Sequence, residues 1–127
     1  MNILLIEPDR ILAKTYQKAL QQAGHIVHLS TTAQSAIYNA DKHAPDLIVL
    51  ELQLVSHSGV EFLYEFRSYP EWQSTPVIVV SNVPPGEFSD SWDVLKDQLG
   101  VVAYRYKPRT SLKTLIRVVD EFATIKS

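Results

Sequence analysis

Four side chains that could take part in chemistry, two carboxylates, a hydroxyl and an ammonium, lie at the ends of short apolar runs. Glu7 follows NILLI, Glu51 follows DLIVL, Ser81 follows VIVV, and Lys107 follows VVAYRY. In an open α/β sheet, the carboxyl ends of parallel strands meet at one edge, where such folds bind ligands and carry out chemistry. A carboxylate at that edge is suited to accept a phosphoryl group.

The elements that must position these side chains alternate regularly. The apolar runs predict strands at residues 2–6, 25–29, 46–50, 77–80 and 101–106. Apolar residues at helical spacing predict helices from the Asp9 cap to Gly24, from Thr31 or Thr32 to Pro45, at 60–68, at 89–99, and from Ser111 onward. Runs such as LIVL are typical of strands that helices cover on both faces. We therefore predict an α/β fold with a doubly wound, five-stranded parallel sheet of the flavodoxin-like type, strand order 2-1-3-4-5 and right-handed crossovers.

The composition is that of one globular domain covering residues 1–127. Hydrophobic residues make up 46% of the chain, which is enough for a packed core. The net charge of −2 argues against binding to nucleic acid or to an anionic membrane. Without cysteine there is no disulfide and no thiolate-bound metal. The N-terminus lacks a secretory signal pattern, and no apolar run approaches the roughly 20 residues of a membrane span. We expect a cytoplasmic protein.

With these residues placed, nearly the whole chain resembles the receiver domain of bacterial response regulators. In that family, acidic residues follow the first strand, a phosphoacceptor aspartate ends the third, a Ser or Thr ends the fourth, and a Lys-Pro pair follows the fifth. The matching residues here are Glu7, Glu51, Ser81 and Lys107-Pro108, and Gly59 matches the glycine that opens the third helix. Each match is weak alone, but five in order make the resemblance specific at the level of the fold.

The resemblance implies a mechanism for such a site. In the family, carboxylates hold Mg²⁺, and Mg²⁺ with the lysine neutralises the phosphoryl oxygens during transfer to the aspartate. The phosphoryl group then recruits the hydroxyl of the fourth strand, and an aromatic residue of the fifth strand swings inward. Ser81 and Tyr104 stand at these two switch positions.

Two residues depart from the family pattern. Glu51 replaces the acceptor aspartate, and its extra methylene moves the carboxylate by roughly 1.3 Å, an error that costs on the order of 100-fold in rate. Pro8 falls on the second acidic position, which supplies a metal ligand in the family, so the acidic pocket is left with Glu7 and with Asp9, one residue later. We interpret the chain as a pseudo-receiver, not an enzyme, with no cofactor and at most weak Mg²⁺ binding at Glu7 and Glu51.

Alternatives stay open at each of these positions. Glu7 and Glu51 either form ion pairs with Lys107 or keep residual affinity for a divalent cation. Ser81 and Tyr104 are either switch residues or an ordinary strand-end hydroxyl and a half-buried aromatic. The negative charge of Glu51 either biases the domain toward an active-like state or leaves it inactive-like or intermediate. A solvent-facing Tyr104 ring would argue against the bias.

The segment NVPPGEFSDSWD, residues 82–93, is the least family-like part of the chain. It makes the interval between Ser81 and Lys107 longer than receivers usually have. Its candidate partner-surface residues are Pro84, Pro85, Phe88 and Trp92, since tryptophan and tyrosine are frequent at binding hot spots. The alternative is that Phe88 and Trp92 are buried against the fourth strand.

The resemblance implies a signalling domain of a two-component phosphorelay that contacts other signalling proteins or an output module and binds no nucleic acid directly. In receivers, the fourth helix, fifth strand and fifth helix form the usual partner surface, which is also a candidate homodimer surface here. We expect action independent of phosphorylation. The alternatives are a working receiver phosphorylated with the help of Mg²⁺, and a small-molecule-binding flavodoxin-like protein.

Overall fold

A single parallel sheet organises the molecule. The computed structural model describes residues 1–126, so Ser127 of the predicted domain lies outside the described residues. The strand order is β2-β1-β3-β4-β5, as the sequence predicts. The strands are β1 (Asn2–Ile6), β2 (Ile26–Ser30), β3 (Leu47–Leu50), β4 (Val77–Ser81) and β5 (Val101–Tyr106). Each bound lies within one residue of its prediction, because β-branched and apolar runs interrupted by polar residues mark buried parallel strands clearly.

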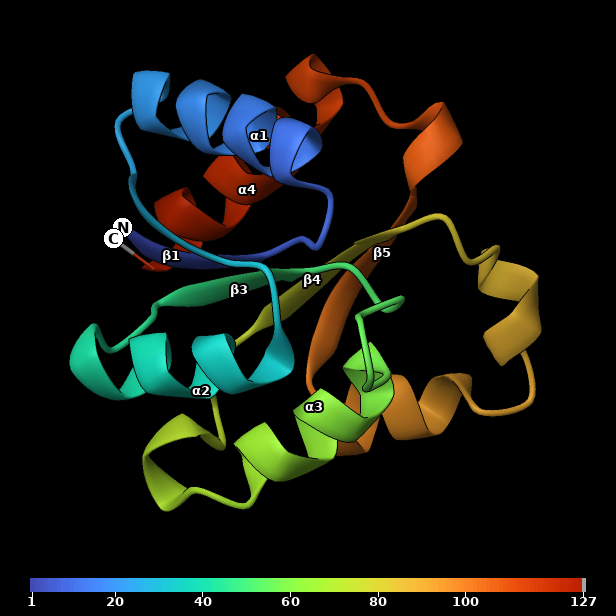
Figure 1. Cartoon of the computed structure of the whole chain (residues 1–127). Helices are drawn as coiled ribbons and strands as arrows, with labels where there is room; N and C mark the ends of the chain where they lie inside the picture. The colour runs from blue at the N-terminus through green and yellow to red at the C-terminus, as the bar shows by residue number, and fades with distance from the viewer. Residues whose placement is uncertain (127) are drawn as a thin grey trace.

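Helices cover the sheet on both faces. Helices α1 (Arg10–Gln22) and α4 (Leu112–Lys126) lie on one face, and α2 (Ala33–Lys42) and α3 (Gly59–Arg67) lie on the other (Figure 1). The structure is therefore doubly wound, as predicted. Among the described helices, none is both long and apolar enough to cross a membrane.

Local signals in the sequence set where the first three helices begin. The Asp9 carboxylate accepts hydrogen bonds from the Ile11 and Leu12 backbone N–H groups at 3.0 and 3.1 Å. Thr32 caps α2 and Ser58 caps α3 through their side-chain oxygens. Such caps satisfy N–H groups that have no partner inside the helix. The caps therefore fix where the loops after β1, β2 and β3 end, at the carboxyl edge of the sheet where the polar residues lie.

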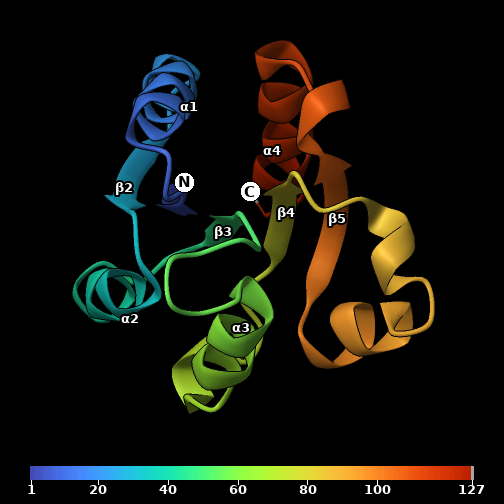
Figure 2. The ribbon, with the colours of Figure 1, turned by 45° about the vertical axis from the view of Figure 1, so that its right-hand side comes forward.

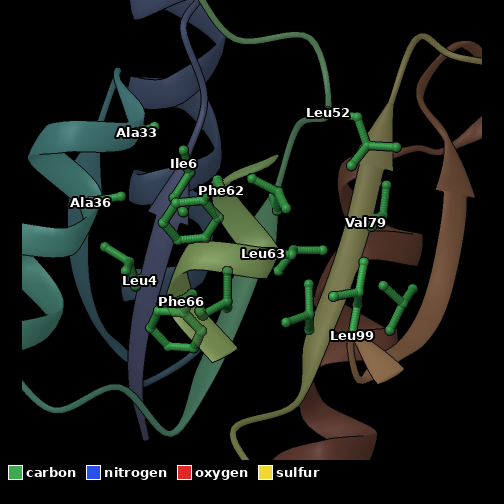
Figure 3. Close-up of a cluster of buried hydrophobic side chains, with 14 of the residues drawn as sticks. Leu4, Ile6, Ala33, Ala36, Leu52, Phe62, Leu63, Phe66, Val79 and Leu99 are labelled. Atoms are coloured by element: carbon green, nitrogen blue, oxygen red, sulfur yellow. The ribbon is translucent and has the colours of Figure 1, made fainter. Parts of the chain in front are cut away.

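The sheet separates two apolar cores. On the α2 and α3 side, Phe62, Leu63 and Phe66 pack against β1 and β4 residues such as Leu4 and Val79 (Figure 3). On the other side, α1 and α4 contribute a second set, which is Tyr16, Leu20, Leu115, Val118 and Val119. Every residue of β3 and β4 is buried. A sheet clamped between two cores is rigid, so the groups at its carboxyl edge are held in place.

The helix predicted at 89–99 forms only in part. Residues 89–91 are a turn and residues 92–98 are helical, with a π-helical segment at Val94–Gln98. A separate 3₁₀ turn at Pro85–Phe88 precedes it. Pro85 opens the 3₁₀ turn, where the backbone N–H that proline lacks would have no partner inside the helix. In the π-helical part, Leu99 N–H donates to the Val94 carbonyl at 3.0 Å. Figure 2 shows this stretch, in gold and orange, lying beside β5 at the edge of the sheet.

An irregularity in β5 decides which way its side chains point. Val77 pairs with Val101, but Ile78 pairs with Ala103, so Val102 is an extra residue in the ladder. Such a bulge re-aims the residues that follow it. Tyr104 consequently pairs with Val79 and packs on the α3 side of the sheet. Lys107 follows the strand directly and begins a 3₁₀ turn at Lys107–Arg109.

Candidate functional site

The carboxyl ends of four strands bring the four predicted polar residues together. Glu7 follows β1, Glu51 follows β3, Ser81 ends β4 and Lys107 follows β5. The side chains of Glu7, Glu51 and Ser81 are buried, although all three are polar. We call these four residues the strand-end site. Buried polar groups are stable only when they are paired or hydrogen-bonded, so their partners determine what the site can do.

Lys107 holds the two carboxylates of the strand-end site together. Its Nζ lies 2.7 Å from Glu7 Oε1 and 2.7 Å from Glu51 Oε1. Burial lowers the pKa of Lys107, but its hydrogen bonds to Glu51 and Glu7 raise it more, so the net shift is upward. The lysine is therefore a cation shared by two anions. Of the two alternatives for Glu7 and Glu51, the ion pairs with Lys107 are the one that the structure contains.

The Glu51 carboxylate has a hydrogen-bond donor on every side. Its Oε1 accepts from Lys107 and from the Asn82 backbone N–H at 3.2 Å. Its Oε2 accepts from the Ser81 hydroxyl and from the Gln53 backbone N–H at 3.1 Å. Burial raises the pKa of Glu51. The hydrogen bonds from Lys107, Ser81 and Gln53 lower it by more, so the pKa lies below its ordinary value. Glu51 is thus held as a carboxylate although only 4% of its surface is exposed.

A chain of hydrogen bonds leads from Glu51 to Tyr104. The Ser81 hydroxyl, which donates to Glu51, accepts from the Val83 backbone N–H at 3.0 Å. The Val83 carbonyl accepts from the Tyr104 hydroxyl at 2.7 Å. Burial raises the pKa of Tyr104 to about 12. The Tyr104 ring is half-buried and packs against one of the two apolar cores.

Asp9 does not join the strand-end site. Its carboxylate is committed to the start of α1, as the cap described above, and its backbone N–H donates to Glu7 Oε2 at 3.0 Å. Asp9 is thus the cap of α1 that the sequence predicts, and its contact with Glu7 is through its backbone N–H. Pro8, at the neighbouring position, has no side-chain oxygen.

The strand-end site offers fewer protein ligands for Mg²⁺ than the resemblance implies, because Pro8 supplies no oxygen at the second acidic position. Mg²⁺ prefers near-octahedral oxygen coordination and is usually held by one or two carboxylates together with water. Here Glu7 and Glu51 are the carboxylates within the site, and Lys107 already occupies one oxygen of each. Within residues 1–126, no group of three or more His, Cys, Asp or Glu side chains is arranged to hold a metal ion.

The segment 82–93 places its large apolar residues at the surface beside Tyr104. Phe88 is half-buried and packs against the core on the α3 side, and Trp92 is 37% exposed. Pro84 and Pro85 are exposed. Neither of the two expectations holds in full: Phe88 is partly covered, and Trp92 is accessible.

Sequence reasoning missed the backbone groups of this site. The N–H groups of Gln53, Asn82 and Val83 all take part in the hydrogen bonds described above. Any residue type except proline can supply such a donor, so the sequence carries no signal for them. Only the path of the loops after β3 and β4 brings them to Glu51 and Ser81.

Comparison with known proteins agrees with this geometry. The family described as response regulator receiver domain matches residues 3–114. The KDP operon transcriptional regulatory protein KdpE of Escherichia coli is 34% identical over 80 residues, which cover 63% of this chain and 34% of that protein. The virulence transcriptional regulatory protein PhoP of Salmonella typhimurium is 30% identical over 81 residues, 64% of this chain and 35% of that protein. The matches therefore span about a third of the length of these relatives.

Solved structures share the whole fold. The chemotaxis response regulator CheY4 of Vibrio cholerae superimposes with a TM-score of 0.82 at 19% identity, covering 95% of this chain and 97% of that one. The receiver domain of the Francisella response regulator 1452 gives a TM-score of 0.82 at 20% identity, covering 99% and 98%. The family match over residues 3–114, on a sheet of this strand order, shows that the chain belongs to the response regulator receiver domains of two-component signalling.

Proposed function

We propose that this receiver domain signals without being phosphorylated, because Glu51 closes the strand-end site. The observation that carries the proposal is the arrangement of donors around the Glu51 carboxylate. Lys107, Ser81 and two backbone N–H groups occupy both of its oxygens. An acceptor must present a free oxygen lone pair to the phosphodonor in line with the leaving group. The Glu51 oxygens are buried and already engaged.

A second argument concerns where a phosphoryl group would go. The groups that would stabilise its charge are the Lys107 ammonium and the Ser81 hydroxyl. Both are in contact with Glu51 itself, through the longer side chain that replaces aspartate. The carboxylate therefore takes the interactions that a phosphoryl group would need. Transfer would require breaking these charge-assisted hydrogen bonds, each worth about 1.5–3 kcal/mol.

The same contacts support an active-like bias. In the mechanism implied by the family, the hydroxyl of the fourth strand moves to the modified acceptor and the aromatic residue of the fifth strand turns inward. Here the Ser81 hydroxyl already donates to residue 51, and the Tyr104 ring is half-buried with its hydroxyl on the Val83 carbonyl. Glu51 carries one negative charge where a phosphoryl group would carry more. Its carboxylate accepts the hydrogen bond from the Ser81 hydroxyl without any phosphoryl transfer.

We further propose that the domain is not an enzyme, needs no Mg²⁺, and acts through contacts with other signalling proteins or an output module. The contact surface includes the exposed residues Pro84, Pro85 and Trp92 with the half-buried Phe88. A homodimer through the same face is the alternative use of this surface. The proposal also keeps the cytoplasmic location expected from the sequence.

Intact mass spectrometry after incubation with acetyl phosphate and Mg²⁺ tests the proposal. We expect no phosphoryl adduct on the unaltered protein. The Pro8→Asp/Glu51→Asp double variant restores the second acid and the shorter acceptor, and should gain an adduct that disappears when Mg²⁺ is removed with a chelator. Glu51→Asp alone should react far less, because Pro8 still denies the metal a ligand. A magnesium-dependent acyl phosphate on the unaltered protein would overturn the proposal.

A further inference from the structure

Two surface pockets adjoin across the ring of Phe88. The first, which we call the aromatic pocket, has a volume of about 300 Å³ and is lined by Pro85, Phe88, Ser89, Trp92 and Tyr104. The second, which we call the loop pocket, has a volume of about 490 Å³ and lies between the loop after β3 and residues 83–88. Phe88 lines both. Neither pocket includes a residue of the strand-end site.

The aromatic pocket presents ring faces and edges to the solvent. The Tyr104 ring contacts both Phe88 and Trp92, with centroid distances of 6.0 and 6.4 Å and interplanar angles of 48° and 65°. These tilted arrangements leave space among the rings instead of closing them into a stack. Pro85 adds a further apolar surface. A pocket of this size and lining suits a single apolar side chain, and aromatic faces also attract cations.

The electrostatic character of this surface is acidic. Residues 82–93 contain Glu87, Asp90 and Asp93 and no lysine or arginine. The loop pocket is lined by Glu61 and Glu87, and among the described residues lining either pocket none is lysine or arginine. Burial is the main cause that raises the pKa of Tyr104, and the charge of Glu87 contributes in the same direction, as expected for a carboxylate near the ring. An anionic partner is therefore disfavoured here.

We propose that the two pockets together bind an extended segment of a partner protein in which an apolar side chain is flanked by arginine or lysine. The apolar side chain enters the aromatic pocket, and a cationic side chain lies over Phe88 and faces Glu87 in the loop pocket. An extended strand places alternate side chains on one side about 7 Å apart, which suits two neighbouring pockets that share one ring. This inference rests on the proposed function, since it names the kind of partner that the domain contacts.

A synthetic peptide probe tests the inference. The probe is capped at both ends and carries a central leucine with a proline and then an arginine on each side. Control peptides replace the arginines with glutamate, or the leucine with serine. Binding is measured by isothermal titration calorimetry, with circular dichroism to confirm that each protein variant is folded. We expect the arginine probe to bind at least about tenfold more tightly than either control peptide.

Protein variants locate the site. Trp92→Leu should weaken binding of the arginine probe by about tenfold, and Glu87→Gln by about threefold with a smaller dependence on salt. Tyr38→Leu and Glu71→Gln are matched controls, because Tyr38 and Glu71 are exposed and line neither pocket. Equal binding of the glutamate peptide, unchanged binding to Trp92→Leu, or no binding of any peptide at millimolar concentration would overturn the inference.

The same titrations separate this inference from the proposed function. They are repeated after incubation with acetyl phosphate and Mg²⁺, with the mass of the protein recorded. If a phosphoryl adduct forms and the probe still binds as predicted, the proposed function fails and the peptide site stands. If no adduct forms and no probe binds, the peptide site fails alone. A concentration-dependent dimer that Trp92→Leu disrupts would show that a second copy of this chain occupies the surface, which also overturns the inference.

Discussion

The side chain at position 51 is one methylene longer than the aspartate of the family pattern. With glutamate there, the carboxylate reaches the Ser81 hydroxyl and the Asn82 N–H while it still contacts Lys107. Removing one partner of a buried ion pair costs far more than the pair contributes, because the remaining charge is left without compensation. In this site each carboxylate depends on Lys107, and Lys107 depends on both carboxylates. The three charged groups are therefore mutually dependent.

The lowered pKa of Glu51 predicts a pH dependence of stability. A carboxyl group whose pKa is lower in the folded chain stabilises the fold fully above its unfolded pKa, ordinarily 4.5, and loses that contribution as the pH falls through the folded pKa. At neutral pH, we expect Glu51→Gln to lower the free energy of unfolding by about 1–3 kcal/mol. The difference between wild type and variant should shrink as the pH falls below the unfolded value.

Urea unfolding at a series of pH values from neutral to acidic measures this difference. Glu71→Gln is the matched control, because Glu71 is exposed, and its difference from wild type should stay small throughout. A wild-type advantage over Glu51→Gln that stayed constant or grew in acid would show that Glu51 is not held as an anion by its neighbours.

At the level of elements, the loop between β3 and α3 fits closely around Gly59. The Gly59 N–H donates to the Leu52 carbonyl at 2.7 Å. A Cβ on Gly59 would lie 2.7 Å from Leu52 Cα and 3.1 Å from the Glu51 carbonyl oxygen. Backbone atoms cannot yield as a flexible side chain can. The glycine that matches the family pattern is therefore required by the packing of α3 against the residues that carry Glu51.

This close approach predicts the effect of adding one methyl group. We expect Gly59→Ala to lower the free energy of unfolding by about 1–3 kcal/mol, because the start of α3 must move away from Leu52. Gly86→Ala is the matched control, since a Cβ there meets nothing within 4 Å, and it should change stability by less than about 0.5 kcal/mol. Denaturant unfolding compares them, and equal stability of the two variants would contradict this account of the loop.

Across the whole molecule, the strand-end site and the aromatic pocket are connected. Ser81 contacts Glu51 and the Val83 N–H, and the Val83 carbonyl contacts Tyr104, which lines the aromatic pocket. The connection therefore runs through the Ser81 side chain, the Val83 backbone and the Tyr104 side chain. We therefore expect a change at residue 51 to alter the aromatic pocket, which residues of segment 82–93 line together with Tyr104.

Ser81→Ala should break this connection. The variant removes the donor to Glu51 and the acceptor of the Val83 N–H, at a cost of about 1–3 kcal/mol. We expect faster amide hydrogen exchange in residues 82–93, while β1, β3 and β4 remain as protected as in wild type. Ser91→Ala is the control within the same segment, because Ser91 is exposed. Unchanged exchange in residues 82–93 of the Ser81 variant would show that the connection does not hold the segment.

The fold followed from the sequence because its signals are local. Each strand is a run of apolar residues, each of the first three helices begins at a side chain able to cap it, and parallel strands bring their carboxyl ends to one edge. Membership of Glu7, Glu51, Ser81 and Lys107 in one site followed from the same rule. The helix expected at 89–99 forms only over residues 92–98 and is mostly π-helical, a backbone pattern that apolar spacing does not distinguish from an α-helix.

What the sequence determined by itself is which residues meet, because strand ends and caps depend on neighbours in the chain. What only the tertiary structure decided is how those residues pair. The packing of loops directed the backbone N–H groups of Gln53 and Asn82 to Glu51, committed Asp9 to α1, and left Trp92 exposed beside Tyr104. The physical reason is that hydrogen-bond partners and exposure depend on distances between segments far apart in the chain, and no local pattern of residues encodes those distances.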